Sequence, residues 1–355
     1  MIAFAIVLLV LVSTVQYFSL KNVLKGISYR SSGSKLLVEP DEDFEIVTTI
    51  TNTSSRFVPY LGLDEPLPGN AKVLCDKTKT RVDVYGDLRY SSTVYLLKKS
   101  HLERRLPISL PERGQYFFKS AYIKTGDFLG IVQDRKNFYS LNSVVVYPKA
   151  ARVEDVTGIL GGFIGDISVR RFIMEDPVLT VGARDYTGSE PLKQISWSHS
   201  ARTNRLMVKQ FDYTAEPTAT VMLDVNSTCE AEEKERRLES CFSIARTVCE
   251  MLEARGIQYD FITNASTGNA LFKWSYIAEG LGRGHFLAIL EGLGRASYFP
   301  TETFAETIEK IHAKRNMNRS TILIMPERDP TKEKMAEKLQ EQGGARVAFL
   351  YGEEI

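Results

Sequence analysis

Residues 218–228 read TATVMLDVNST and decide the fold of the second half of the chain. The first six are apolar or β-branched and have the length of a buried strand. Apolar residues then recur on one helical face from Leu238 to Leu252, Gly256 ends that pattern, and residues 257–262 read as another strand. This alternation predicts a mostly parallel sheet with helices on both of its faces.

The same alternation continues to the end of the chain. Further helices are expected near 286–292, 304–313 and 331–342, and further strands at 321–325 and 347–350. We therefore interpret residues 218–355 as a doubly wound, Rossmann-like α/β domain.

The preceding region has the pattern of an antiparallel β domain. From Phe44 to Ile50, apolar and polar residues alternate with the period of a half-buried strand. Similar short runs, separated by turn sequences, follow at 81–85, 92–96, 116–118 and 143–147. Strands at this spacing predict a small antiparallel β-sandwich over 36–150.

Residues 2–20 form an uncharged apolar segment about as long as a membrane-spanning helix. A cleaved signal peptide and a buried soluble helix are the alternatives, but no basic residue precedes the run and no small-residue cleavage site ends it. Lys21, Lys25, Arg30 and Lys35 follow it, so the positive-inside rule places the remaining chain in the cytoplasm. We expect a single-pass protein of the cell membrane with most of its chain cytoplasmic.

These patterns divide the chain into five segments. They are a transmembrane anchor (1–20), a juxtamembrane linker (21–35), the β-sandwich (36–150), a connector (151–217) and the α/β domain (218–355).

Composition excludes several classes of protein. The 355 residues carry 45 Lys and Arg against 44 Asp and Glu, a formal net charge of +1, which argues against a sequence-blind nucleic-acid binder. The four cysteines lack C-x-x-C spacing, so a zinc ribbon is not expected. No phosphate-binding G-x-x-x-x-G-K-[ST] loop and no G-x-S-x-G elbow is present. We therefore predict a protein that is not an enzyme.

Oxygen-bearing side chains follow the strand 218–223. Asp224, Asn226 and Thr228 lie at two-residue spacing and could present hard oxygen ligands to Mg²⁺. The run resembles the start of the metal-ion-dependent adhesion motif of von Willebrand factor A domains, D-x-S-x-S, in a degenerate form. The alternative is helix capping, in which Ser227 or Thr228 accepts from a free backbone N–H at the start of the following helix.

The connector contains a second pattern, which mixes charged and aromatic residues at fixed offsets. Its residues are Gly182, Arg184, Asp185, Tyr186, Glu190, Trp197, Ala201 and Arg202. A structural interpretation pairs Arg184 with Asp185 or Glu190 and packs Tyr186 and Trp197 on a sheet. An interaction surface is the other interpretation.

This segment resembles the signature of the bacterial domain-of-unknown-function family fifty-eight (DUF58), roughly G-x-R-D-Y-x-x-G-D, then I-x-W-x-x-x-A-R and L-x-V. It departs from that signature at Ser189-Glu190, where the family has Gly-Asp, and at Lys193, where the family has Arg. Further matches extend the resemblance over most of the chain after the apolar segment, at 113–116, 125–130, 146–148 and 285–290.

The resemblance implies a membrane-anchored cytoplasmic protein with a β domain and a von Willebrand A-like domain. It also implies a partner, because members are typically encoded beside MoxR-type AAA+ ATPases. The usual two membrane helices appear here as one. Our leading hypothesis is a non-enzymatic scaffold or adaptor for such an ATPase. The alternatives are a metal-dependent hydrolase using Asp224 with acidic residues such as Asp185 and Glu190, and an extracellular adhesion module.

Overall fold

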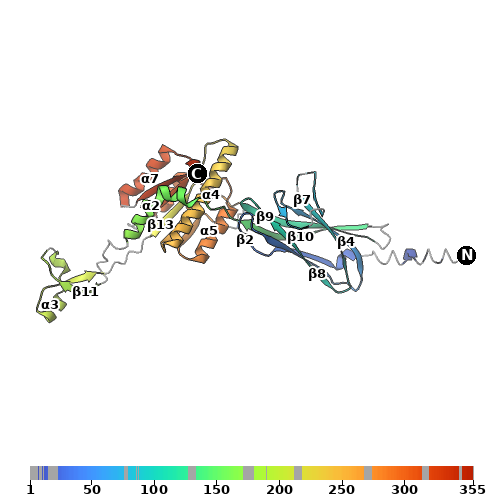
Figure 1. Cartoon of the computed structure of the whole chain (residues 1–355), viewed down its shortest axis with the longest axis horizontal. Coiled ribbons are helices and arrows are strands. Elements are labelled where there is room, and N and C mark those ends of the chain that lie inside the picture. Colours follow the sequence, from blue (N-terminus) through green and yellow to red (C-terminus); the bar gives the residue numbers. More distant parts are fainter. Residues whose placement is uncertain are drawn as a thin grey trace. The chain divides into compact units, whose positions relative to one another are not determined.

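The computed structural model describes most of the chain in two compact units, Met1–Lys149 and Ala150–Ile355 (Figure 1). The described residues are 7, 10, 12–14, 23–75, 79–84, 86, 88–126, 133–170, 180–188, 190–211, 218–267, 274–313, 320–343 and 346–354. Among these residues, the first unit is built almost entirely of strands, whereas the second combines strands with helices.

The first unit is a sandwich of two sheets. One has the strand order β1-β3-β8-β5 and the other the order β2-β10-β9-β4-β7-β6. Their pairings are antiparallel, except that the short β2 runs parallel to β10. The strands are β1 (Ile27–Gly33), β2 (Leu37–Val38), β3 (Phe44–Asn52), β4 (Val58–Leu67), β5 (Lys72–Val73), β6 (Thr80–Val82), β7 (Leu88–Leu96), β8 (His101–Ser109), β9 (Gly114–Gly126) and β10 (Gln133–Val146).

Side-chain alternation builds the core of this sandwich. In β3 every second residue from Phe44 to Asn52 is buried, which is the period that a strand with one core face requires. Ile46 and Ile108 of one sheet are buried together with Leu67 and Val144 of the other. The predicted linker 21–35 differs from expectation, because β1 lies inside it and pairs with β3.

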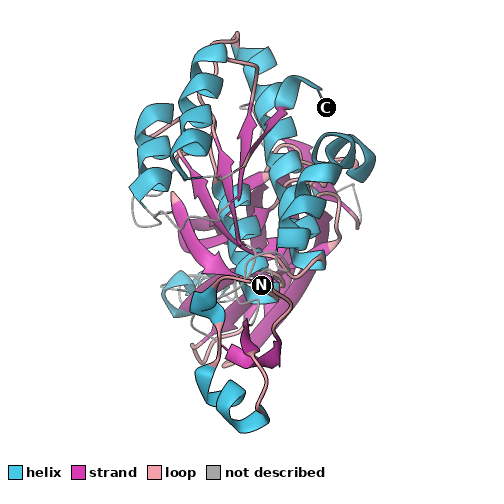
Figure 2. Ribbon diagram, turned by 90° about the vertical axis from the view of Figure 1, so that its left-hand side faces the viewer, coloured by secondary structure: helices cyan, strands magenta, loops and turns pink. Residues whose placement is uncertain are grey.

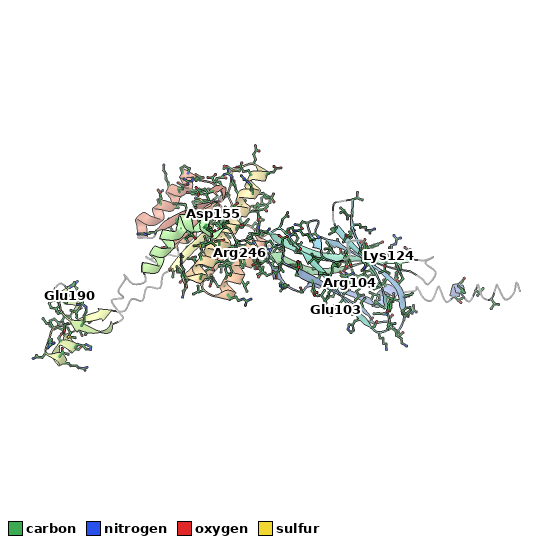
Figure 3. The ribbon with its side chains drawn as sticks, in the orientation of Figure 1. Glu103, Arg104, Lys124, Asp155, Glu190 and Arg246 are labelled. Atoms are coloured by element: carbon green, nitrogen blue, oxygen red, sulfur yellow. The ribbon has the colours of Figure 1, made fainter. Side chains whose placement is uncertain are left out.

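A buried charge pair interrupts this apolar core. Glu65 of β4 is 5% exposed, and its carboxylate accepts from the Arg104 guanidinium of β8, from Tyr29 Oη at 2.7 Å and from Thr48 Oγ1 at 3.0 Å. Arg104, labelled in Figure 3, also lies over the Tyr90 ring, 5.2 Å from its centroid. Glu65 and Arg104 come from different sheets, so their ion pair joins the two layers.

The second unit contains a five-stranded sheet in the order β15-β14-β13-β16-β17. Its strands are β13 (Thr218–Leu223), β14 (Gln258–Thr263), β15 (Tyr276–Gly280), β16 (Ser320–Met325) and β17 (Val347–Tyr351). Neighbouring strands are parallel, except that the edge strand β15 is antiparallel to β14. All six residues of β16 are buried, as expected for a central strand covered on both faces.

Helices lie on both sides of this sheet (Figure 2). Their bounds are α2 (Val153–Arg170), α4 (Ala231–Ala254), α5 (Arg283–Arg295), α6 (Phe304–Ala313) and α7 (Pro330–Gly343). One face packs Met222 and Leu323 against Ile308 of α6 and Ala336 of α7. The helix α4 buries one stripe from Leu238 to Leu252, as its sequence spacing predicts.

A separate two-stranded sheet lies in the predicted connector. It pairs β11 (Thr180–Asp185) antiparallel with β12 (Met207–Phe211), and α3 (Trp197–Thr203) lies between them in the sequence. Short 3₁₀ turns occur at Val23–Gly26, Leu192–Gln194 and Gly352–Glu354.

The predicted membrane anchor requires correction. Among the described residues, no helix is both long and apolar enough to cross a membrane. Most of the predicted span 2–20 lies outside those residues. Single-pass anchoring in the cell membrane, and the cytoplasmic placement derived from it, are therefore not supported.

The predicted fold class is wrong in a second respect. The described part of the chain is rich in β structure, with four separate sheets, and the structure does not support a von Willebrand A-like identity for 218–355. That identity was predicted from the DUF58 resemblance and from a degenerate metal motif after β13. The structure instead places a lysine ammonium on the Asp224 carboxylate.

We predict that Arg104→Ala lowers the free energy of unfolding of the first unit by about 3–5 kcal/mol, because it leaves the buried Glu65 carboxylate without its counter-ion. Urea denaturation measures the effect. Arg105→Ala is the matched control, since the Arg105 side chain is 62% exposed and should contribute less than about 1 kcal/mol. Equal losses in the two variants would show that the buried pair has no special role.

Candidate functional site

Three central strands of the second unit end at the same edge of the sheet, and polar residues follow each of them. Asp224 follows β13, Asn264 follows β14, and Glu327 lies two residues after β16. In open α/β sheets this carboxyl edge is where ligands bind. We name these residues and the side chains that bond to them the strand-end network: Asp224, Asn226, Ser227, Thr228, Cys229, Arg237, Asn264, Glu327 and Lys332.

The Asp224 carboxylate is fully buried and fully partnered. One oxygen accepts from Lys332 Nζ at 2.7 Å, and the other accepts from Asn264 Nδ2 at 2.6 Å and from the Asn226 N–H at 3.0 Å. Lys332 Nζ also donates to the Asn226 carbonyl at 2.8 Å. A buried charge persists when it is paired and hydrogen-bonded in this way. The negative charge of Asp224 is thus neutralised by the ammonium of Lys332, a residue of α7.

Glu327 organises the loop on the other side of the network. Its oxygens accept from Ser227 Oγ at 2.8 Å, from the Thr228 N–H at 2.9 Å and Oγ1 at 3.0 Å, and from Cys229 Sγ at 2.8 Å. Burial alone would raise the pKa of Glu327, but these hydrogen bonds outweigh it and lower the pKa to about 2. Arg237 of α4 adds an ion pair at 3.4 Å.

The side chains of the three predicted magnesium ligands each bond to a different protein group. Asp224 is committed to Lys332, the Asn226 side chain reaches the Glu302 carbonyl at 3.5 Å, and Thr228 bonds to Glu327. Across the described ranges, no three His, Cys, Asp or Glu side chains are grouped so that they could hold a metal ion. Magnesium binding stays a prediction, and the arrangement seen is a network of protein groups only.

The capping alternative is wrong. The residue that caps α4 is Glu230, which makes no side-chain hydrogen bond to the helix. Ser227 Oγ does accept from a backbone N–H, that of Cys229 at 3.2 Å, but this bond lies before the helix begins, and the Ser227 and Thr228 hydroxyls donate to Glu327. Sequence reasoning missed Glu327, Asn264 and Lys332 as members of the site. The available signal was that Asn264 and Glu327 each follow a buried apolar strand.

The connector residues form a local turn. Arg184 of β11 pairs with Glu190, which also accepts from the Thr187 N–H at 3.1 Å and from its Oγ1 at 2.7 Å. The hydrogen bond from Thr187 and the ion pair with Arg184 lower the pKa of Glu190 to about 2, although desolvation opposes them. Glu190 is labelled in Figure 3.

The other signature residues lie around that turn. Gly182 and Asp185 belong to β11, the Tyr186 N–H donates to the Leu206 carbonyl, and Trp197, Ala201 and Arg202 lie on α3. Trp197 is 67% exposed, so it does not pack on a sheet as the structural interpretation expected.

An exposed loop borders the strand-end network. Phe299 is 72% exposed, and its carbonyl accepts from the Ser266 N–H at 2.9 Å. Pro300 forms a bridge with Ala265, and the Thr301 N–H and Oγ1 both donate to the Asn264 carbonyl. The loop is therefore tied to the end of β14 while its aromatic side chain faces solvent. We call Thr228, Phe299, Pro300 and Arg328, which are exposed in this region, the strand-end platform.

Comparisons with known proteins return only distant structural likenesses. No family model and no curated protein matches the chain. Among solved structures, a CARDB domain of the PF1109 protein from Pyrococcus furiosus is 15% identical, with a TM-score of 0.23, over 34% of this chain and 91% of that one. A PapD-like domain of human CEP192 is 13% identical, with a TM-score of 0.21, over 34% and 86%. A ScaC cohesin from Acetivibrio cellulolyticus is 11% identical, with a TM-score of 0.24, over 34% and 99%.

These likenesses are too weak to carry a conclusion about function. The DUF58 resemblance and the partner that it implies stay predictions, because neither a family model nor a curated protein matches the chain.

We predict that Lys332→Met destabilises the second unit by about 3–5 kcal/mol, because the buried Asp224 carboxylate loses its counter-ion. Lys334→Met removes an exposed lysine from the same helix and should change stability by less than about 0.5 kcal/mol. Chemical denaturation, followed by the circular dichroism of the helices, measures the free energy of unfolding of both variants. If the two variants lose the same free energy of unfolding, the ion pair does not stabilise the unit. Stabilisation of Lys332→Met by Mg²⁺, absent in the wild type, would show that a metal ion can replace the ammonium.

A second prediction concerns pH. The pKa of Glu327 is lowered to about 2 in the folded chain, below the ordinary value of about 4.3, so its contribution to stability is present above pH 5 and is lost as the pH falls toward 2. Glu327→Gln should therefore be less stable than the wild type by about 1–3 kcal/mol at pH 7, with the gap narrowing below pH 5. Urea midpoints between pH 7 and pH 3 test this. Glu230→Gln, an exposed change in the loop after β13 to which Glu327 bonds, should give no such gap.

Proposed function

We propose that this chain is a non-catalytic protein-interaction module, which binds a partner protein through the strand-end platform. The observation that carries the proposal is Phe299. It is 72% exposed, yet its loop is held at the carboxyl edge of the sheet by hydrogen bonds to Asn264 and Ser266. A large aromatic side chain presented on a fixed loop is the kind of residue that dominates protein–protein binding energy.

The chemistry of the edge favours binding over catalysis. The Asp224 and Glu327 carboxylates, which sequence alone would offer as acid or base, are engaged by Lys332 and by the hydroxyl and N–H donors of residues 227 and 228. A general base must reach a substrate proton, which the Asp224 carboxylate, with no exposed surface and both oxygens hydrogen-bonded, is poorly placed to do. These bonds instead fix the loop geometry, which lowers the entropy lost on binding a partner.

The partner that we propose is a MoxR-type AAA+ ATPase. Support for this class comes from the sequence resemblance in the connector, where Arg184, Asp185, Tyr186 and Trp197 match the pattern. The platform combines the apolar Phe299 and Pro300 with the polar Thr228 and Arg328, which suits a contact with an apolar core and a polar rim.

We predict that Phe299→Ala weakens binding of the full chain to a purified MoxR-type ATPase by tenfold or more, because truncating an aromatic anchor typically costs about 2 kcal/mol. Surface plasmon resonance with nucleotide present measures the affinity. Thermal melting should be unchanged, since the ring is mostly exposed.

Tyr139→Ala is the matched control, because Tyr139 is an aromatic that is 77% exposed on the first unit. It should leave the affinity unchanged. Failure of the wild-type chain to bind the ATPase would remove the proposed partner, whereas equal binding by Phe299→Ala would remove the proposed surface.

A further inference from the structure

One edge of β7 is open over most of its length. β4 pairs with β7 from Leu88 to Leu96, but on the other side β6 pairs only with Leu88–Tyr90. Among the described residues, no strand lies against that side beyond Tyr90, and no backbone hydrogen bond reaches residues 91–96 from it. Because alternate residues of a strand point their backbone N–H and C=O groups to opposite edges, every second residue of this stretch presents unpaired groups.

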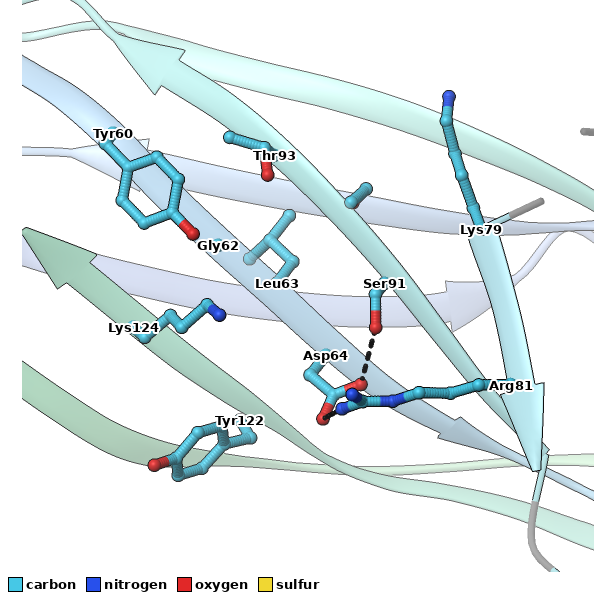
Figure 4. A pocket seen from close by; sticks show the side chains of 11 residues that line it. Tyr60, Gly62, Leu63, Asp64, Lys79, Arg81, Ser91, Thr93, Tyr122 and Lys124 are labelled. Atoms are coloured by element: carbon cyan, nitrogen blue, oxygen red, sulfur yellow. Dashed lines mark hydrogen bonds and ion pairs between the residues drawn. The ribbon is translucent and has the colours of Figure 1, made fainter. Parts of the chain in front are cut away.

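The open edge lacks the features that normally protect a strand edge from pairing. Residues 91–96 read SSTVYL, without a charge, a proline or a glycine. A cavity of about 490 Å³ lies beside Ser91 and Thr93, which Figure 4 shows along β7. An extended peptide can therefore add here as a further strand, with main-chain hydrogen bonds for affinity and a cavity for one of its side chains.

Apolar side chains are exposed at the end of this edge. Tyr95 is 64% exposed, and Leu97 and Phe57 are exposed as well. The Phe57 ring lies 6.4 Å from the Tyr95 ring, measured between centroids. The buried Asn52 fixes this group, because its side-chain amide donates to the carbonyls of Arg56 and Leu97, both at 2.8 Å. The three side chains thus form a fixed apolar patch beside the open edge.

The surroundings of this patch are basic. Residues 49–63 and 90–102, which supply the parts of β3, β4, β7 and β8 at this end of the sandwich, contain no Asp or Glu. Lys98 and Lys99 follow the edge directly and are exposed, and neither makes an ion pair with any residue that the structure describes. The Lys99 N–H donates to the Ser54 carbonyl at 2.9 Å, which holds this turn against the turn after β3. Both lysines are within two or three residues of the edge, and a strand rises only about 3.3 Å per residue.

We propose that β7 binds an extended acidic segment of a partner protein, which adds to the sheet as a strand. Its backbone pairs antiparallel with residues 91–96, as β4 and β6 do with β7. Its apolar side chains cover Phe57 and Tyr95, and its carboxylates meet Lys98 and Lys99. A second copy of this chain fits less well, because self-pairing of an edge without acids brings no carboxylate to the two lysines. The site is on the first unit and does not depend on the strand-end platform.

The test measures binding of a fluorescent eight-residue peptide to the full chain by fluorescence anisotropy. The peptide has two N-terminal glutamates, which antiparallel pairing brings to the lysines, followed by alternating threonine and apolar residues. We expect saturable binding that becomes roughly tenfold weaker when two lysines replace the glutamates. N-methylation of alternate residues gives two further peptides. Since an added strand turns only every second N–H toward β7, one of them should bind like the parent and the other should lose binding.

Variants of the chain test the charge and the apolar patch separately. Lys98→Glu combined with Lys99→Glu should weaken binding of the acidic peptide at least roughly tenfold. Lys334→Glu combined with Lys338→Glu is the matched control, because it makes the same change in charge at exposed positions of α7 and should leave the affinity unchanged. Tyr95→Ala should also weaken binding roughly tenfold, as expected for an aromatic anchor. Thermal melting reports that each variant is folded.

Three results would overturn the proposal: no binding of the acidic peptide, equal effects of the two methylation patterns, or equal losses in the two double variants. Sedimentation of the chain alone tests the other occupant. A dimer that Thr93→Lys converts to a monomer would place a second copy on the open edge, and would also overturn the proposal.

Discussion

The buried Asp224 carboxylate is the constraint on which the second unit depends. A charge with no exposed surface at the end of a central strand must be neutralised, and the chain supplies Lys332 from a different helix. Asn264 holds the second oxygen and also accepts, through its carbonyl, the bonds that tie down the loop bearing Phe299. One electrostatic requirement therefore links two strand ends, two loops and a helix.

Local pattern predicted much of this unit. The periodicity of apolar residues predicts strand β13, the buried stripe of α4 and the later alternation of strands and helices. It does so because a buried face requires apolar residues at regular intervals in the sequence. The sandwich strand β3 shows the same trace with period two. Predictions that rested on composition or on a partial motif were weaker. The anchor was predicted from the apolar run 2–20 and a family resemblance, and the magnesium site from the spacing of Asp224, Asn226 and Thr228 in a degenerate motif.

The site could not be predicted in full because its decisive partners are remote in sequence. Lys332 lies 108 residues after Asp224, on a helix whose pattern is simply polar, and Glu327 lies 99 residues after Thr228. Charged residues so far apart in the sequence produce no periodic pattern from which their pairing could be predicted. The close approach of Gly62 and Lys124 in the sandwich is equally hidden in the sequence, because their strands, β4 and β9, are neighbours only in the folded sheet.

The Asp224–Lys332 pair also has a consequence for how the chain folds. The loop after β13 cannot adopt its final form until α7 has been synthesised and docked, because closing a loop of 108 residues must precede the ion pair. Long-range contacts of this kind slow folding relative to local ones. During synthesis the sandwich, which precedes this unit in the chain, can form first. The region of β13 and α4 cannot complete its structure until the last quarter of the sequence is made, because Asp224 has no counter-ion before then.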